Sequence, residues 1–167
     1  MKIVLAIDPG SRVAGFAVCS CKDDDHFDLS SFSIIEAGVI RLNTKKSHTE
    51  RLSDLHSVVK GLFEKYSPDF FVLEKAFCGV NMSSALKLGE VRGSLISLSY
   101  SQGAKLIELS PKYVKSMITG KGGASKEEVA HALELLVGFN KGKLPFDASD
   151  AVALAVSSGL YFNEHNL

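Results

Sequence analysis

The chain of 167 residues lacks the features that mark several protein classes. No apolar run approaches the roughly 18 residues that a membrane-spanning helix needs. The opening residues lead directly into a short strand pattern instead of a signal peptide. There is no low-complexity tract, and hydrophobic residues make up 46% of the chain, which argues against disorder. We therefore expect one globular domain over residues 1–167, located in the cytoplasm.

Cysteine is scarce and the net charge is zero. Cys19, Cys21 and Cys78 form no pair of pairs of the kind that binds zinc, and the first two fit one face of a strand as small hydrophobic residues. Lysine plus arginine equals aspartate plus glutamate at 19 each, so net charge does not indicate a nucleic-acid partner. The distribution is uneven, however, because residues 111–126 contain four lysines and no acid.

Hydrophobic periodicity predicts strands and helices in a definite order. Short apolar runs predict strands at residues 2–7, 15–20, 31–42, 70–74 and 104–109. Helical spacing and capping signals predict helices at residues 50–66 and 82–102, from residue 111, at 126–139 and at 144–156. The first three strands suit an antiparallel meander, whereas strands that alternate with helices require parallel pairing. We expect an α/β fold in which a mixed sheet carries helices on both faces.

Four carboxylates stand where such a sheet forms binding sites. Asp8 and Glu74 end two predicted strands, and sites in these sheets lie outside the carboxyl ends of the strands. Asp147 and Asp150 share one face at the head of the last helix, because three residues separate them. Helix capping explains these two aspartates equally well. If the four carboxylates meet, they form a hard oxygen site suited to Mg²⁺ or Mn²⁺ and not to zinc.

The chain resembles the RuvC family, the bacterial Holliday junction resolvases, in five ordered segments that cover nearly its whole length. These segments are IDPGSRVAGFAV (7–18), LEKAF (73–77), SSALKLGEVRG (83–93), YVKSMITGKGGASK (113–126) and DASDAVALAV (147–156). The resemblance implies a ribonuclease H-like nuclease domain, a homodimer, and Mg²⁺-dependent nicking of opposed strands at a four-way DNA junction in recombination and repair. It also implies a branch-migration motor complex as a partner.

The same resemblance implies roles for individual residues. The catalytic, metal-binding carboxylates of the family match Asp8, Glu74, Asp147 and Asp150, which implies two Mg²⁺ ions per site, with Mn²⁺ as a substitute. Phe77 matches an aromatic residue near the cut, and Lys115 and Lys126 match basic residues that approach the DNA backbone. Lys75 departs from the family, in which glutamine often follows the glutamate. The chain also ends at YFNEHNL, without the longer basic tail of some members.

Other interpretations of these residues stay open. Each lysine taken singly fits a solvated surface, and Phe77 fits a core aromatic. An actin-like or sugar-kinase-like ATP-binding domain also begins with a strand, an aspartate and a glycine turn, but it needs two lobes and this chain is too short for both. A junction-binding protein without catalytic activity is a further alternative, although all four carboxylates are present.

The predicted helix at residues 82–102 carries two apolar stripes. The sheet can bury the first, which consists of Leu88, Val91, Leu95 and Leu98. The second follows on another side of the helix and consists of Met82, Leu86, Gly89, Gly93, Ile96 and Tyr100. It fits either a helix sandwiched inside one core or a two-fold interface. Because a four-way junction has two symmetry-related strands to cut, we expect a homodimer with this helix at the interface.

Overall fold

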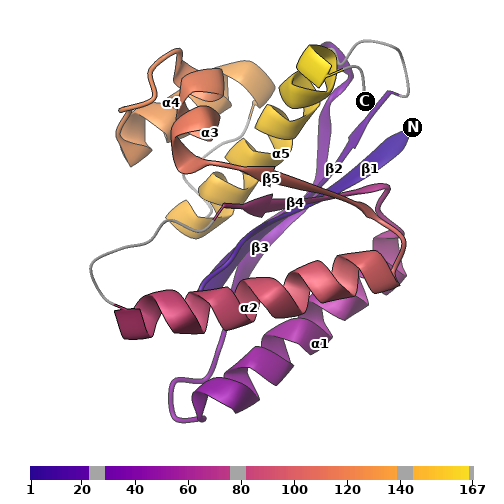
Figure 1. The fold of residues 1–167 in the computed structure, drawn as a ribbon. Helices are drawn as coiled ribbons and strands as arrows, with labels where there is room; N and C mark the ends of the chain where they lie inside the picture. The colour runs from indigo at the N-terminus through magenta and orange to yellow at the C-terminus, as the bar shows by residue number, and fades with distance from the viewer. Residues whose placement is uncertain (23–28, 76–81, 139–144, 166–167) are drawn as a thin grey trace.

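The computed structural model describes residues 1–22, 29–75, 82–138 and 145–165. Within these residues the strands are β1 (Lys2–Asp8), β2 (Val13–Cys21), β3 (Ser33–Arg41), β4 (Phe70–Glu74) and β5 (Lys105–Leu109). The helices are α1 (His48–Tyr66), α2 (Met82–Ser101), α3 (Pro111–Thr119), α4 (Lys126–Val137) and α5 (Phe146–His165), with a 3-10 turn at Leu29–Ser31. Each strand and helix expected from the sequence is present, so the predicted element order is confirmed (Figure 1).

The strands form one mixed sheet in the order β3-β2-β1-β4-β5. β1 pairs antiparallel with β2, and β2 pairs antiparallel with β3, as the short connections predict. β4 is parallel to β1 and to β5. The β1–β4 register pairs Ile7 with Leu73, so the next residues, Asp8 and Glu74, reach the same edge of the sheet.

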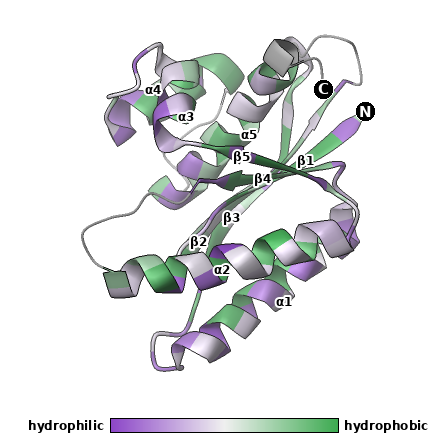
Figure 2. Cartoon of the chain, in the orientation of Figure 1, coloured by the Kyte–Doolittle hydropathy of each residue, from purple (hydrophilic) through white to green (hydrophobic). Residues whose placement is uncertain are grey.

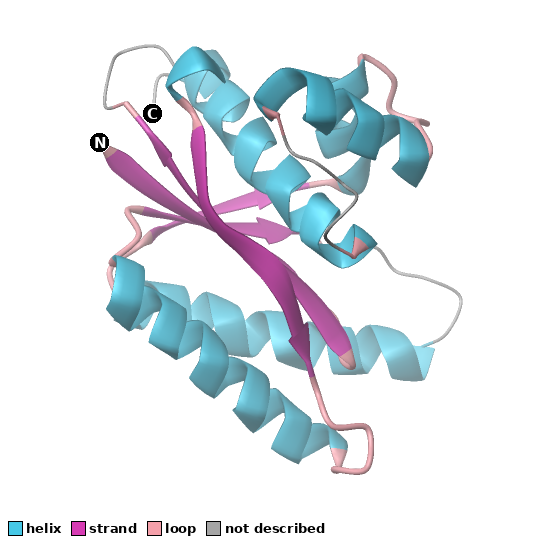
Figure 3. Ribbon diagram, turned by 180° about the vertical axis from the view of Figure 1, so that it is seen from behind, coloured by secondary structure: helices cyan, strands magenta, loops and turns pink. Residues whose placement is uncertain are grey.

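Helices cover both faces of the sheet. Figures 1 and 3 show α1 and α2 on one face and α5 on the other, with α3 and α4 beside α5. Alternate residues of β1 serve the two cores: Leu5 and Ile7 pack in the core with α1 and α2, whereas Val4 and Ala6 pack in the core with α5. Burial on both sides makes the central strands almost continuously hydrophobic (Figure 2). None of the described helices is long and apolar enough to cross a membrane.

The last helix is built for burial against the sheet. Its residues from Ala151 to Val156 are at most 2% exposed. α5 continues to His165, beyond the predicted end at residue 156. Its residues Ser157 and Ser158 are buried as well. The hydroxyl of Ser158 donates to the carbonyl of Ala155 at 2.7 Å, which lets a polar side chain lie inside this helix at little cost.

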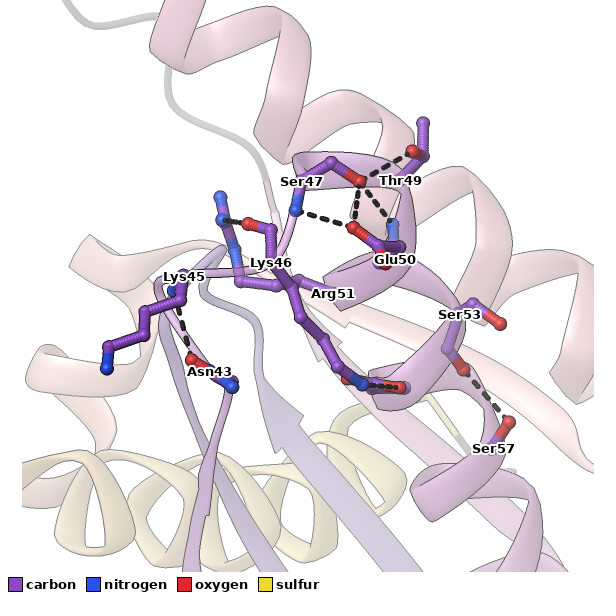
Figure 4. Close-up of polar contacts among 10 residues, drawn as sticks. Asn43, Lys45, Lys46, Ser47, Thr49, Glu50, Arg51, Ser53 and Ser57 are labelled. Atoms are coloured by element: carbon purple, nitrogen blue, oxygen red, sulfur yellow. Dashed lines mark hydrogen bonds and ion pairs between the residues drawn. The ribbon is translucent and has the colours of Figure 1, made fainter.

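Local signals set most helix ends. Ser125 and Glu128 form the predicted capping box of α4, and Ser110 caps α3 ahead of Pro111. α1 begins with a second capping box, Ser47 with Glu50, which the sequence patterns above did not identify (Figure 4).

The cysteines agree with the prediction as far as they are described. Cys19 and Cys21 are buried and belong to the core that contains α5. Cys78 lies outside the described residues. The two described cysteines are therefore packing residues on β2.

Candidate active site

A pocket of about 380 Å³ opens at the carboxyl edge of β1 and β4, where α3, α4 and α5 meet the sheet. Five of the seven site residues expected from the sequence line it, namely Asp8, Glu74, Asp150, Lys115 and Lys126. Asp147 is not among the lining residues, but its charge acts on Asp8. Phe77 lies outside the described residues. Residues far apart in the chain thus share one pocket that combines carboxylates with lysines.

Asp8 is held by a short turn between β1 and β2. A side chain at Gly10 would place its first carbon 1.9 Å from the carbonyl oxygen of Val13, so this tight turn requires glycine. Arg51 of α1 donates from Nε to the carbonyl of Ser11 at 2.9 Å. It also donates to the carbonyl of Lys46 at 2.6 Å, a contact drawn in Figure 4. The turn that follows Asp8 is therefore tied to α1 by an arginine that the sequence patterns did not single out.

Glu74 is the last residue of β4 and is fixed from two sides. On one side the next backbone N–H, that of Lys75, donates to the carbonyl of Leu109 on β5 at 2.8 Å. On the other side the guanidinium of Arg92, which comes from α2, donates to the carbonyl oxygen of Glu74 and to the carboxylate of Glu108. Arg92 is a second residue that the sequence patterns did not reveal.

The two aspartates of α5 reach the site because the helix lies directly on β2. A side-chain carbon at Gly15 would lie 1.8 Å from the carbonyl oxygen of Asp147, so glycine alone permits this approach. Gly15 is also the residue paired with Asp8 across β1 and β2. Asp150, one helical turn after Asp147, accepts a hydrogen bond from the ammonium of Lys126 at 2.6 Å.

The site holds more negative charge than its cations offset. Burial raises the pKa of Asp8 to about 7, and the neighbouring charges of Glu74, Asp150 and Asp147 contribute to this rise against the opposing effect of Lys126. Burial and the charge of Asp150 also raise the pKa of Glu74. The pKa of Lys126 is raised because its hydrogen bond to Asp150 favours the charged ammonium. Such perturbed groups gathered in one pocket are typical of a functional site.

The donor set fits a hard divalent cation. The pocket presents three carboxylates, and its described lining contains neither a thiol nor an imidazole. A cation would offset the mutual repulsion that raises the pKa of Asp8. In the described part of the chain, no three His, Cys, Asp or Glu side chains are arranged as a ready ligand set for one ion. The ammonium of Lys126 binds one of the two oxygens of Asp150, so a metal ion would compete with it only for that oxygen.

A five-stranded mixed sheet in this order, with carboxylates at the carboxyl ends of its first and fourth strands, has the ribonuclease H-like fold. The family model for the crossover junction endodeoxyribonuclease RuvC matches residues 4–158. The chain therefore belongs to the RuvC family, and the resemblance drawn from its motifs is confirmed.

Relatives and solved structures agree with this assignment. The crossover junction endodeoxyribonuclease RuvC of Chlorobium phaeovibrioides is 39% identical over 154 residues, which are 92% of this chain and 79% of that protein. The RuvC of Bdellovibrio bacteriovorus is 37% identical over 92% of this chain and 87% of its own.

Among solved structures, RuvC of T. thermophilus in complex with a Holliday junction substrate superimposes with a TM-score of 0.86 at 23% identity, covering 99% of this chain and 98% of that one. The yeast mitochondrial Holliday junction resolvase gives a TM-score of 0.65 at 19% identity, covering 99% and 83%. At these identities the structures establish the shared fold.

Proposed function

We propose that this protein is an endonuclease that resolves four-way DNA junctions by nicking two opposed strands, in homologous recombination and DNA repair. The observation that carries the proposal is the pocket in which Asp8, Glu74 and Asp150 stand beside Lys115 and Lys126. Carboxylates suit metal-dependent phosphodiester hydrolysis, and lysines suit the phosphate backbone that enters such a site. Membership of the RuvC family supports the choice of substrate.

The metal we propose is Mg²⁺, with two ions per site and Mn²⁺ as a substitute. The ligands would be Asp8, Glu74, Asp147 and Asp150, because the charges of the other three carboxylates all act on Asp8. Bound ions of this kind activate water and neutralise charge on the scissile phosphate. The protein's own part is to hold four carboxylates at one edge of a rigid sheet.

The lysines have a separate task in this proposal. Lys115 lines the pocket from α3, and Lys126 lines it from the first turn of α4. Their ammonium groups attract the DNA backbone and hold a phosphate over the carboxylates. Lys126 binds Asp150 in the structure, and its ammonium would become available to a phosphate if a metal ion neutralised that carboxylate.

Phe77 completes the proposed substrate site. It follows β4 by three residues in the sequence, between Glu74 and α2. An aromatic ring next to a nuclease site stacks on unpaired bases or wedges between them. Replacement by alanine should therefore lower the nicking rate more than it lowers junction affinity, whereas equal losses would indicate a packing role.

A homodimer follows from the second apolar stripe of α2. Three large side chains of this stripe are exposed, with Met82 at 78%, Leu86 at 65% and Tyr100 at 71%, whereas Ile96 is partly buried against the core with α1 and α2. A side-chain carbon added at Gly89 or Gly93 would meet no neighbouring atom within 4 Å, so packing inside the chain does not explain these glycines. An exposed apolar helix face with small residues fits a two-fold partner, and two sites related by one axis can cut both strands.

Sedimentation tests the dimer. The wild type should sediment as a dimer at micromolar concentration, and Gly89→Lys should yield monomers that nick poorly and without coordination. A monomeric wild type, or a fully active and still dimeric Gly89→Lys, would refute this interface. In the cell we further propose a branch-migration motor complex as a partner and a cytoplasmic location, both from family membership.

A labelled synthetic four-way junction tests the main proposal. Purified protein with Mg²⁺ should convert the junction into two nicked duplexes, and a chelator should stop the reaction. Junction binding without cleavage would instead identify a catalytically silent junction-binding protein. ATP turnover without cleavage would identify an actin-like or sugar-kinase-like domain.

A further inference from the structure

We propose that Arg92 is a positioning residue that fixes Glu74 for metal binding. It acts from α2, outside the pocket, through the backbone carbonyl of Glu74. The inference rests on the proposed function, because it takes Glu74 as a metal ligand. It assigns a role in the reaction to a buried cation that does not itself touch the substrate.

The contacts of Arg92 hold its buried guanidinium in one position. The residue is only 8% exposed, and an unpaired guanidinium in such a place is strongly unfavourable. The guanidinium meets the carbonyl of Glu74 with one nitrogen and the carboxylate of Glu108 with another. These acceptors lie near the carboxyl ends of β4 and β5. One side chain thus ties both strand ends to α2.

Glu74 needs this support because it stands at the end of a ladder. The pairing of β4 with β1 stops at Ile7 and Leu73, one residue before Glu74. Toward β5 the ladder continues through the N–H of Lys75. The carbonyl of Glu74 is bound by the guanidinium, which fixes the peptide plane and therefore the direction in which the Glu74 side chain leaves the strand. A displacement of about 1 Å at such a site can cost about 100-fold in rate.

The charge of Arg92 acts in the same direction. Arginine stays protonated at any pH at which the enzyme works, so its positive charge is permanent. It offsets the repulsion between Glu74 and the nearby Asp150, as Lys126 and Lys115 also do. Unlike Lys126, which is exposed and bonded to Asp150, the guanidinium is locked by two protein acceptors. We therefore expect it to stay in place when DNA and metal bind.

Three variants separate positioning from general stability. Arg92→Met removes every donor but keeps an unbranched stem that reaches as far as Nε, and Arg92→Lys keeps one donor group and the charge. Leu95→Ala is the matched control, because Leu95 is 1% exposed on the same helix and belongs to the core with α1. Each variant is compared for melting temperature, for Mn²⁺ affinity without DNA by electron paramagnetic resonance, and for junction nicking as a function of Mg²⁺.

We expect Arg92→Met to lower Mn²⁺ affinity by about 10- to 100-fold, the range seen when groups that orient metal ligands are removed. Nicking should fall most at low Mg²⁺ and recover in part at high Mg²⁺. Arg92→Lys should restore part of the affinity. Leu95→Ala should lower the melting temperature and leave Mn²⁺ affinity within about twofold of the wild type, since a core truncation costs stability without touching the site.

Unchanged Mn²⁺ affinity in folded Arg92→Met overturns the proposal, as does an equal loss in Leu95→Ala. If Arg92→Met does not fold, Glu108→Gln takes its place, because it loosens one anchor of the guanidinium and keeps the bond to Glu74. A several-fold loss of Mn²⁺ affinity in Glu108→Gln supports the proposal, and no loss overturns it. A wild type that neither binds Mn²⁺ nor nicks the junction contradicts the proposed function instead, so the two failures are distinguishable.

Discussion

Glu36 on β3 and the acids at the carboxyl edge of the sheet lie in opposite electrostatic environments. Glu36 on β3 accepts hydrogen bonds from the Tyr66 hydroxyl and, at 2.9 Å, from the Lys65 ammonium. These donors lower its pKa. Asp8 and Glu74 are half-buried among like charges, and partial burial and these charges raise their pKa values.

The difference shows which acids serve the fold. A carboxylate whose pKa is lowered by donors stabilises the folded state, whereas one whose pKa is raised destabilises it when ionised. Evolution keeps such an unfavourable group where it has chemistry to perform. The contrast between Glu36 and Asp8 therefore predicts a structural role for Glu36 and a functional role for Asp8, which experiments can test.

The largest difference in junction nicking should appear when one carboxylate charge is removed at the carboxyl edge of the sheet and, in a separate variant, one on β3. Asp8→Asn should lower junction nicking by more than about 100-fold, because loss of a direct ligand exceeds the 10- to 100-fold typical of its supporting groups. Glu36→Gln should leave nicking unchanged. Junction binding by Asp8→Asn should be equal to wild type or tighter, since repulsion of phosphate is reduced. Nicking by Asp8→Asn in Mg²⁺ at the wild-type rate would contradict the site assignment.

Moving the α5 acids without altering any charge is the second test. Gly15→Ala should push α5 away from β2, because the new carbon would lie 1.8 Å from the carbonyl of Asp147. We expect a loss of about 1–3 kcal/mol in the free energy of unfolding and about 100-fold in nicking. Gly61→Ala, where nothing lies within 4 Å, is the control and should cost neither. Full activity in Gly15→Ala would show that the site tolerates a displaced helix.

Stability against pH gives the third comparison. In metal-free protein Asp8 has a pKa of about 7 when folded and 3.8 as the reference value, so the folded state binds more protons between these values. The free energy of unfolding should therefore decrease as pH rises from about 4 to about 7, by up to roughly 4 kcal/mol, because the two pKa values differ by about 3 and each unit corresponds to about 1.4 kcal/mol.

Melting curves in chelator at pH 5 and pH 8 measure this effect. Asp8→Asn cannot ionise at this position, so it should show a flatter dependence and melt above the wild type at pH 8. Added Mn²⁺ should stabilise the wild type more at pH 8 than at pH 5, because the ionised form binds the metal. If the melting temperatures of the two proteins change equally with pH, ionisation of Asp8 does not destabilise the folded state.

The smallest expected effect concerns the lysines that face the acids. Lys115→Ala should reduce the salt dependence of junction binding by about one unit of slope, the loss of one phosphate contact. Lys105→Ala is the control, because Lys105 is exposed at the amino end of β5, away from the carboxyl edge. The measurement is junction affinity at several salt concentrations without divalent metal. If the salt dependence of junction binding has the same slope in Lys115→Ala and in the wild type, Lys115 is a surface residue that makes no phosphate contact.

The four carboxylates of the candidate site could be predicted from the sequence because they stand at the ends of strands and at the start of a helix. Asp8 and Glu74 could be placed because apolar runs end at them, and strand pairing then brought them to one edge. Asp147 and Asp150 could be placed on one face because helical spacing is regular. The glycine inside a strand pattern at Gly15 was a usable signal of close backbone approach, although only the structure shows which backbone approaches.

The arginines could not be found in this way. Arg92 contacts Glu74 across 18 positions in sequence, and Arg51 contacts Ser11 across 40. Periodicity reports which face of a helix is buried, but it does not report which acceptor a buried polar side chain meets. Arg92 occupies the buried side of α2 together with Leu95, and a charged residue at such a position was the one available hint.

The burial of α5 against β2 also has a consequence for synthesis of the chain. Asp8 emerges from the ribosome among the first residues, whereas Asp150 follows 142 positions later (150 − 8 = 142). Because translation proceeds at about 5–20 residues per second, the sheet residues are complete before the last helix exists. A nascent or truncated chain that ends before residue 147 carries only half of the carboxylates. If the four carboxylates form the catalytic set, a chain without its final helix would be inactive, so activity would depend on the docking of α5 after synthesis.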